Sequence, residues 1–431
     1  MCRNTTHGSD SVRECGGVAA LVHLLAPGSS AAVHEQAAAA LSKLCWDDWQ
    51  NRVSVRECGG VAALVGLLAP GMTDAVHQEA AAALRSVCGN HTQSCISVRE
   101  CGGVVALVGL LAPGGTAAVH EQAAAALRSL CFDKTRIRDS VRECGGVAAL
   151  VGLLPSGGSA AVHAAAVLRK LCDNDIQNCD SVRECGGDAA LVGLLALDGT
   201  DAVHKEATRA LYNLCDNTGC QDSVRECGGI AALVALLAPG GPARTHRWAA
   251  AVLAGLCTNN TRNQDSVREC GGVPALVGLL APGRIKAVRG RAAAELAGLC
   301  TDTTVNQYSD RECGAMQALV SLCTNNTRNQ DSVRECGGVP TLVALMAPAR
   351  PADVHTRAAN ALTLIARDSA RGREAVRACG GAAALERVLG RASSAAAHEW
   401  AAAALRHLGQ PGGRDLGRWL QQAVGALGRP D

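Results

Sequence analysis

Two columns of cysteine are the feature of this sequence that most resembles a chemical site, because cysteine thiolates bind metals and undergo redox chemistry. The chain has 22 cysteines, and most of them recur at two fixed places in an internal repeat. The first column is Cys15, Cys58, Cys101, Cys144, Cys185, Cys227, Cys270, Cys313, Cys336 and Cys379, and the second is Cys45, Cys88, Cys131, Cys172, Cys215, Cys257, Cys300 and Cys323. Structural zinc needs four converging ligands, commonly with Cys-x₂₋₄-Cys spacing, which these columns do not supply. We therefore expect both columns to pack as small buried side chains, with thiol-based metal or redox chemistry as the alternative function.

Histidine forms a third column, at the predicted start of one helix in each repeat. Its members are His34, His77, His120, His163, His204, His246, His355 and His398. Equivalent positions in neighbouring helices lie roughly 8–10 Å apart, which is too far for two side chains to share a metal ion. We expect these histidines to be solvated, because histidine is more often exposed or half-exposed than fully buried.

Catalytic residue types show no arrangement that departs from the repeat. The Cys-Gly-Gly steps lack the Gly-x-x-x-x-Gly-Lys-Ser/Thr phosphate loop and the Gly-x-Gly-x-x-Gly dinucleotide pattern, so we interpret them as turns. No nucleophile motif or pair of carboxylates stands apart from the repeat. The sequence therefore predicts a protein that is not an enzyme, with no catalytic residue, no metal and no cofactor.

A repeated string, Ser-Val-Arg-Glu-Cys-Gly-Gly with small variations, sets where these side chains lie. Its cysteines are separated by 43, 43, 43, 41, 42, 43, 43, 23 and 43 residues, and a period of about 40–47 residues is typical of stacked helical units. In the repeat of residues 95–137, Ser97 begins a short first helix that the glycine pair at 102–103 ends. A second helix is predicted over 104–111, and a third over 117–131 from apolar residues at three- and four-residue spacing.

Composition favours an intracellular protein without a bound nucleic acid or a membrane span. Aromatic residues make up 2% of the chain and the net charge is +2, so no global attraction to nucleic acid is expected. Residues 1–240 carry 18 basic against 24 acidic side chains, whereas 241–300 carry 8 against 3. The N-terminus lacks the apolar region of a secretory signal, and no run approaches 18 apolar residues. We expect a cytoplasmic or nuclear location.

The pattern Val-Arg-Glu-Cys-Gly-Gly-Val-x-Ala-Leu-Val-x-Leu-Leu, followed by Val-His-Glu-x-Ala-Ala-x-Ala-Leu-x-x-Leu, resembles the armadillo repeat. The resemblance implies an all-α, right-handed superhelical solenoid with three helices in each unit of about 43 residues, and it covers residues 9–411. We expect about nine full repeats and a truncated repeat near 307–329, because residues 257–274 and 323–340 are identical. Residues 1–8 are then an N-terminal tail, and 412–431 a C-terminal capping helix and tail.

The same resemblance implies that the third helices line a concave groove for an extended peptide. Importin-alpha-like members of the family line this groove with ladders of asparagine and tryptophan. Only Asn213 matches the asparagine column here, and no tryptophan stands in the column four residues earlier. We therefore disfavour a nuclear transport receptor and predict a non-catalytic protein–protein interaction scaffold or adaptor.

Basic side chains in the middle of the chain are the predicted partner-binding residues. Helical spacing groups Lys205, Arg209 and Asn213 on one third helix, Arg247 and Trp248 on the next, and Arg291 on the one after. Arginine and tryptophan often anchor interfaces through charged hydrogen bonds and stacking. We predict that residues 205–291 bind an acidic extended segment of another protein; the alternative is a solvated basic face with a partly buried tryptophan.

Overall fold

The described part of the chain contains helices, turns and bends and no strand, which confirms the all-α prediction. The computed structural model describes residues 6–131, 135–195, 199–215, 217–280, 314–348, 350–390 and 394–409. The chain divides into two compact bodies, residues 1–223 and 224–431. We call them the N-terminal body and the C-terminal body and describe each by itself.

One repeat consists of a short first helix, a short second helix and a long third helix. In the third repeat these are α7 (Thr92–Glu100), α8 (Gly103–Gly109) and α9 (Ala117–Leu130). Two different constraints require the glycine pair between α7 and α8: Gly102 has a φ of +76°, and a Cβ on Gly103 would meet a methyl group of Val98 at 2.5 Å. The hydroxyl of Thr116 accepts a hydrogen bond from the Val119 amide and caps the third helix. The second and third helices agree with the predicted bounds within two residues. The first helix begins at Thr92 and not at the predicted Ser97, because the His91 side chain caps it by accepting a hydrogen bond from the Ser94 amide.

The described residues of the N-terminal body contain this order five times. The first helices are α1 (Thr6–Glu14), α4 (Trp49–Glu57), α7, α10 (Thr135–Glu143) and α13 (Ile176–Glu184). The second helices are α2 (Gly17–His23), α5 (Gly60–Gly66), α8, α11 (Gly146–Leu153) and α14 (Gly187–Gly193). The third helices are α3 (Ala31–Cys45), α6 (Asp74–Cys88), α9, α12 (Gly158–Leu171) and α15 (Asp201–Leu214). Helix α16 (Thr218–Glu226) begins the next repeat and spans the boundary between the bodies.

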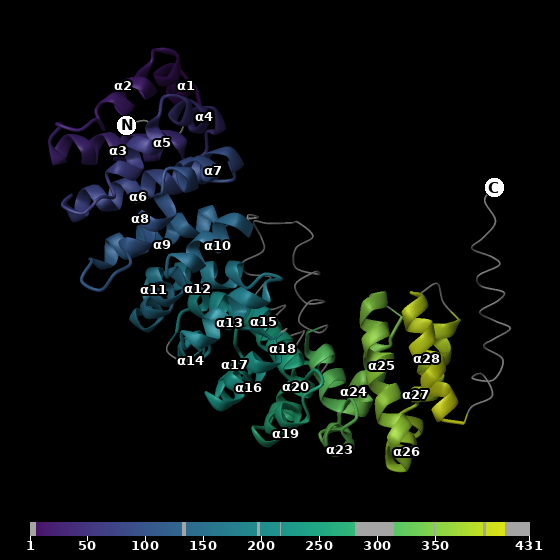
Figure 1. The fold of residues 1–431 in the computed structure, drawn as a ribbon. Helices are drawn as coiled ribbons and strands as arrows, with labels where there is room; N and C mark the ends of the chain where they lie inside the picture. The colour runs from purple at the N-terminus through teal and green to yellow at the C-terminus, as the bar shows by residue number, and fades with distance from the viewer. Residues whose placement is uncertain are drawn as a thin grey trace, which may run out of the picture. The chain divides into compact units, whose positions relative to one another are not determined.

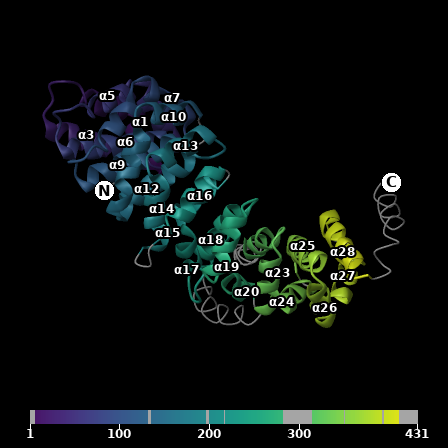
Figure 2. The same cartoon turned by 60° about the horizontal axis from the view of Figure 1, so that its bottom comes forward.

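The C-terminal body continues the same order over its described residues. Its elements are α17 (Gly229–Leu236), α18 (Ala243–Cys257), α19 (Thr261–Glu269), α20 (Gly272–Leu280), a helix over 314–323, α23 (Thr327–Glu335), α24 (Gly338–Leu345), α25 (Ala352–Asp368), α26 (Ala370–Ala378), α27 (Gly381–Leu389) and α28 (Ala395–His407). Helix α25 packs on α28 as one third helix on the next, and α24 lies against α26 and α27 (Figure 2).

The third helices form the main packing layer of the N-terminal body. Helix α3 packs on α6, α6 on α9, α9 on α12 and α12 on α15 (Figure 1). Leu84, Leu127 and Leu168 come from successive third helices and are fully buried, and each such leucine stabilises the stack by about 1.5–3 kcal/mol. The alanines beside them, such as Ala81 and Ala124, are fully buried too. Small side chains thus let the helix axes approach closely and compensate for the few aromatic residues.

A column of hydrogen-bond donors ties the described first helices α4, α7, α13, α19 and α23 to the third helices. The C-terminal carbonyl groups of a helix have no partner within that helix. Gln264 on α19 donates its amide to the carbonyl of Cys257 at the end of α18 at 3.1 Å, and to that of Ser321 at 2.9 Å. The equivalent donors and acceptors are Arg52 to Cys45, Cys95 to Cys88, Cys179 to Cys172 and Gln330 to Cys323. This column links successive layers through otherwise unsatisfied carbonyl groups.

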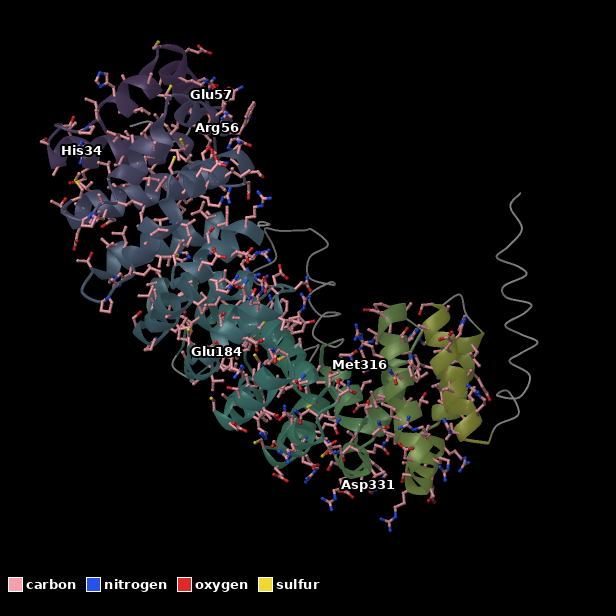
Figure 3. The ribbon with its side chains drawn as sticks, in the orientation of Figure 1. His34, Arg56, Glu57, Glu184, Met316 and Asp331 are labelled. Carbon is pink, nitrogen blue, oxygen red and sulfur yellow. The ribbon has the colours of Figure 1, made fainter. Side chains whose placement is uncertain are left out.

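Residues 314–323 form a single helix, within the segment where we predict a truncated repeat. A Cβ on Gly314 would lie 3.1 Å from the carbonyl oxygen of Arg247, so this helix packs directly on α18. Helix α19 contacts α23, and α20 contacts α24. The Asn326 amide donates to the Gln264 side chain at 3.1 Å. The helix, which carries Met316 (Figure 3), therefore stands where the third helix of the α19–α20 repeat belongs.

The predicted ends of the solenoid are only partly covered by the described residues. Helix α1 begins at Thr6, inside the segment of residues 1–8 that we expected to be a tail. The predicted capping helix and tail at 412–431, and residues 307–313 of the predicted short repeat, lie outside the described residues. Among the helices that the structure describes, none is long and apolar enough to cross a membrane.

Candidate interaction surface on the third helices

The first cysteine column is not buried, so the expectation that both columns pack in the core was wrong for it. Cys15, Cys58, Cys101, Cys185, Cys227, Cys270 and Cys336 are exposed, and Cys144 and Cys379 are half-buried. The reason is local: the cysteine follows the last residue of the first helix, beside a charged pair such as Arg56 and Glu57, whose side chains lie 3.1 Å apart (Figure 3). Partial burial and the adjacent Glu184 raise the pKa of Cys185, so this thiol is not activated as a thiolate.

The second cysteine column is buried wherever the structure describes it, which confirms the packing interpretation. Its described members are Cys45, Cys88, Cys131, Cys172, Cys215, Cys257 and Cys323. Burial raises the pKa of Cys45 and of Cys131 to about 12, so these thiols stay protonated and inert. In the described ranges, no group of three or more His, Cys, Asp or Glu side chains is arranged to hold a metal ion.

The histidine column fastens a loop. The expectation that these rings are solvated is confirmed for the half-exposed His77, His120, His163 and His398, and was wrong for the buried His34, His204, His246 and His355. The Nε2 atoms of His34, His77, His120, His246, His355 and His398 lie 3.0–3.1 Å from main-chain carbonyl oxygens at the end of the preceding second helix. A carbonyl oxygen only accepts, so each Nε2 carries the proton. The ring of His246 is 1% exposed, and a Cβ on Gly241 would meet its Nε2 at 2.7 Å. Histidine and glycine together close the turn between the second and third helices.

His163 is the exception in this column, and the sequence shows why. It stands nine residues before Cys172, whereas His120 stands eleven before Cys131. The missing two residues rotate His163 away from the loop carbonyl, and its Nδ1 instead accepts a hydrogen bond from Arg128 at 3.2 Å. Burial, with the charges of Arg128 and Arg85, lowers the pKa of His163 to about 4. The ring is therefore neutral at physiological pH.

The predicted basic residues of the N-terminal body surround one buried carboxylate. Glu206 lies 3.1 Å from Lys205, 3.5 Å from Arg209 and 3.3 Å from Arg169. Burial raises the pKa of Glu206, but the hydrogen bond from Lys205 and the charges of Arg209 and Arg169 outweigh it and hold the pKa below its usual range. Asn213 donates its amide to the carbonyl of Arg169 at 2.8 Å. The structure thus brings Lys205, Arg209 and Asn213 together, with Glu206 and Arg169 as members that the prediction missed.

The other predicted residues fall in the C-terminal body. The guanidinium of Arg247 lies over the Trp248 ring, 5.0 Å from its centroid, which is within the range of a cation–π contact. Both side chains are half-buried on α18. Arg291 lies outside the described residues.

A row of arginines on the third helices of the N-terminal body was missed by sequence reasoning. Arg85 on α6, Arg128 on α9 and Arg169 on α12 each stand three residues before the second-column cysteine of their repeat. The exposed ring of Trp46, at the end of α3, lies 4.8 Å from the guanidinium of Arg85. The signal in the sequence is the fixed place of these arginines in the repeat, three residues before the second-column cysteine.

Asp188 on α14 departs from the repeat inside the core. Its position holds valine in other repeats, as at Val104 and Val147, and the Asp188 side chain is 1% exposed. Neither carboxylate oxygen accepts a hydrogen bond of normal geometry. Burial raises the pKa of Asp188 against the opposing effects of Ser223 and Arg183.

Known proteins share this architecture. The family profile of the Armadillo/beta-catenin-like repeat matches residues 5–46. An engineered protein of known structure is 27% identical, with 91% of this chain and 88% of that chain covered and a TM-score of 0.78. A second engineered protein is 28% identical over 56% of this chain and 96% of its own, with a TM-score of 0.52. A designed armadillo repeat protein is 23% identical over 56% of this chain and 99% of its own, with a TM-score of 0.51, and shows the fold alone. No curated protein matches the sequence.

Proposed function

We propose that this chain, whose repeats and fold match the armadillo repeat, is a non-catalytic scaffold or adaptor that binds segments of other proteins on its third helices. One observation carries the proposal. Three cations share the single carboxylate of Glu206, and the side chains of Lys205 and Arg209 stay 33% and 28% exposed. The excess positive charge would attract an acidic extended segment, whose carboxylates would pair with the exposed cations.

Arg247 and Trp248 form a second proposed anchor, in the C-terminal body. A half-buried aromatic ring with a guanidinium over its face offers both apolar area and a charged hydrogen-bond donor. Side chains of these two types are enriched among the residues that dominate binding energy. The proposal treats this anchor separately from the Glu206 cluster.

Two alternative functions receive less support. In an importin-alpha-like receptor the asparagine ladder would face cargo, but the Asn213 amide is hydrogen-bonded to the carbonyl of Arg169. A thiol-based metal or redox protein would need activated or converging thiols, whereas burial raises the pKa of Cys45 and Cys131. We also propose an intracellular location, because the cysteines that the structure describes are all free thiols.

The proposed function can be tested with a matched pair of variants in the full-length protein. Arg209→Glu/Trp248→Ala changes the two proposed anchors, both on third helices. Arg136→Glu/Trp49→Ala makes the same changes at exposed positions of the first helices α10 and α4. Each protein is used for affinity capture from the source cell, and captured proteins are identified by mass spectrometry.

We expect one or more partners to be lost from Arg209→Glu/Trp248→Ala and retained by the control variant. Identical partner sets for both variants would contradict the proposed anchors. No partner for any form, including the wild type, would contradict the scaffold function.

A further inference from the structure

We propose that Trp46, Arg85, Arg128 and His163, which we call the arginine row, bind an acidic segment in polyproline II conformation with a carboxylate at every third residue. The inference deepens the proposed function and rests on it, because it names a further surface and the shape of its partner. It concerns the N-terminal body alone.

The members of the arginine row form one continuous surface across four third helices. Trp46 directly follows the last residue of α3, Arg85 lies on α6, Arg128 on α9 and His163 on α12, and these helices pack in that order (Figure 1). The Trp46 ring stacks against the guanidinium of Arg85 at 4.8 Å. Arg128 donates to His163 at 3.2 Å. Arg85 and Arg128 also act on each other electrostatically, because Arg128 contributes to lowering the pKa of Arg85 after burial, which is the larger cause.

The two arginines of the row are not members of an ion pair among the described residues, although the charge of Glu121 acts on Arg85 against the larger effect of burial. Within the described residues, no carboxylate lies within ion-pair distance of Arg85 or Arg128. Arg85 is half-buried, and its buried Nε atom has no hydrogen-bond partner among the described residues. The equivalent arginine one repeat later, Arg169, is paired with Glu206 at 3.3 Å. An incoming carboxylate at Arg85 and Arg128 would therefore supply the partner that Glu206 already supplies to Arg169.

The spacing of the row selects the conformation of the partner. Arg85 and Arg128 stand at equivalent positions of the packed helices α6 and α9, and the axes of packed helices lie about 8–10 Å apart. A polyproline II helix has three residues per turn and a rise of about 3.1 Å, so every third side chain faces the same way at steps of about 9.3 Å. A β-strand presents one face every second residue, at steps of about 6.7 Å. The strand falls about 2 Å short of the step from Arg85 to Arg128, whereas the polyproline II helix matches it.

Two further features favour a peptide over a nucleic acid. Trp46 is 54% exposed and offers an aromatic face on which proline rings dock, as in other sites that recognise polyproline II segments. Residues 1–240 carry 24 acidic against 18 basic side chains, so the surroundings of the row repel a long polyanion. A short segment with three or four carboxylates avoids most of that repulsion.

A synthetic peptide tests this inference directly. Fluorescein-labelled (Glu-Pro-Pro)₄ is titrated with the full-length protein and followed by fluorescence anisotropy. Comparison peptides are (Gln-Pro-Pro)₄, which lacks charge, and (Glu-Thr)₄, which has the same number of carboxylates at every second residue. The variant Arg85→Glu/Arg128→Glu is matched by Arg136→Glu/Arg371→Glu, which reverses two exposed charges on the first helices α10 and α26.

We expect (Glu-Pro-Pro)₄ to bind at least tenfold more tightly than either comparison peptide. Arg85→Glu/Arg128→Glu should weaken binding by about tenfold or more, since charged hydrogen bonds are lost, and the matched variant should stay within about twofold. In the wild type, bound carboxylates should raise the pKa of His163 from its value of about 4, as measured by NMR. The ring also feels Arg85, Arg128 and Glu206, so both variants are titrated without peptide as references.

Three results would overturn the inference. Equal binding of (Glu-Thr)₄ would refute the polyproline II geometry, and unchanged binding by Arg85→Glu/Arg128→Glu would refute the site. Tighter binding of single-stranded RNA at the same arginines would refute the class of partner. If no peptide binds while Arg209→Glu/Trp248→Ala still loses captured partners, the arginine row fails and the proposed function stands.

Discussion

Replacing Asp188 by valine should stabilise the protein, because it restores the residue of the other repeats. The carboxylate is 1% exposed and lacks a hydrogen bond of normal geometry, which costs about 1–3 kcal/mol. A buried valine adds about 1.5–3 kcal/mol, as it does at Val147, which is 3% exposed. Since the two contributions overlap in part, we expect Asp188→Val to raise the free energy of unfolding by about 2–4 kcal/mol.

The gain in the free energy of unfolding from Asp188→Val should also increase as pH rises. Burial raises the pKa of Asp188 in the folded state, so the folded protein binds more protons than the unfolded chain above pH ~4. The stabilising contribution of the protonated Asp188 is therefore lost as pH rises through its folded-state pKa. The stability advantage of Asp188→Val over the wild type should then be larger at pH 7.5 than at pH 4.5.

Urea unfolding followed by circular dichroism at both pH values measures these effects. The matched control is Val147→Asp, which places a carboxylate at the same position one repeat earlier and should destabilise by a similar amount. A less stable Asp188→Val, or a gain that shrinks as pH rises, would refute the reasoning and point to a stabilising partner of the carboxylate.

Three more predictions concern the other columns of the repeat. Thiol labelling of the native protein, followed by mass spectrometry, should modify exposed Cys101 rapidly and buried Cys88 only after unfolding; similar rates would contradict the burial pattern. The pKa of His163 falls to about 4 in the folded state, below about 6.5 when unfolded, so His163→Gln should remove part of the stability loss that urea unfolding detects as pH falls from 6.5 to 4. Gln264→Leu should destabilise by about 1–3 kcal/mol, because its amide serves the carbonyls of three residues; an unchanged unfolding midpoint would show that water replaces it.

The repeat architecture could be predicted from the sequence because its signals are local. Gly102 and Gly103 mark the end of the first helix whatever surrounds them, and Thr116 marks the start of the third. Buried positions such as Leu127 follow from helical spacing. Each of these signals acts within a few residues, so one repeat is enough to place them.

The roles of cysteine and histidine depended on contacts that residue type does not reveal. Cys101 and Cys131 are the same residue type in the same repeat, yet one follows a short first helix at the surface and the other ends a buried third helix. His246 was expected to be solvated, but the loop before it returns a carbonyl oxygen to its Nε2, and the residue is buried. A shift of two residues in the next repeat gave His163 a different partner.

The candidate surface was predicted only in part, because pairing between repeats decides which charges stay available. Lys205 and Arg209 were recognised as basic, but Glu206 beside them was not recognised as their shared partner. Arg85 and Arg128 look like any other arginines in the sequence, and only the packing of α6 on α9 brings them into one row.

Site-specific photo-crosslinking tests most directly whether partners bind on the third helices. Tyr212→p-benzoylphenylalanine places the probe at an exposed position of α15, and Arg136→p-benzoylphenylalanine places it at an exposed position of the first helix α10. A partner captured by the wild-type protein is irradiated with each form. We predict crosslinks from position 212 and none from position 136. Crosslinks from position 136 alone would contradict binding on the third helices.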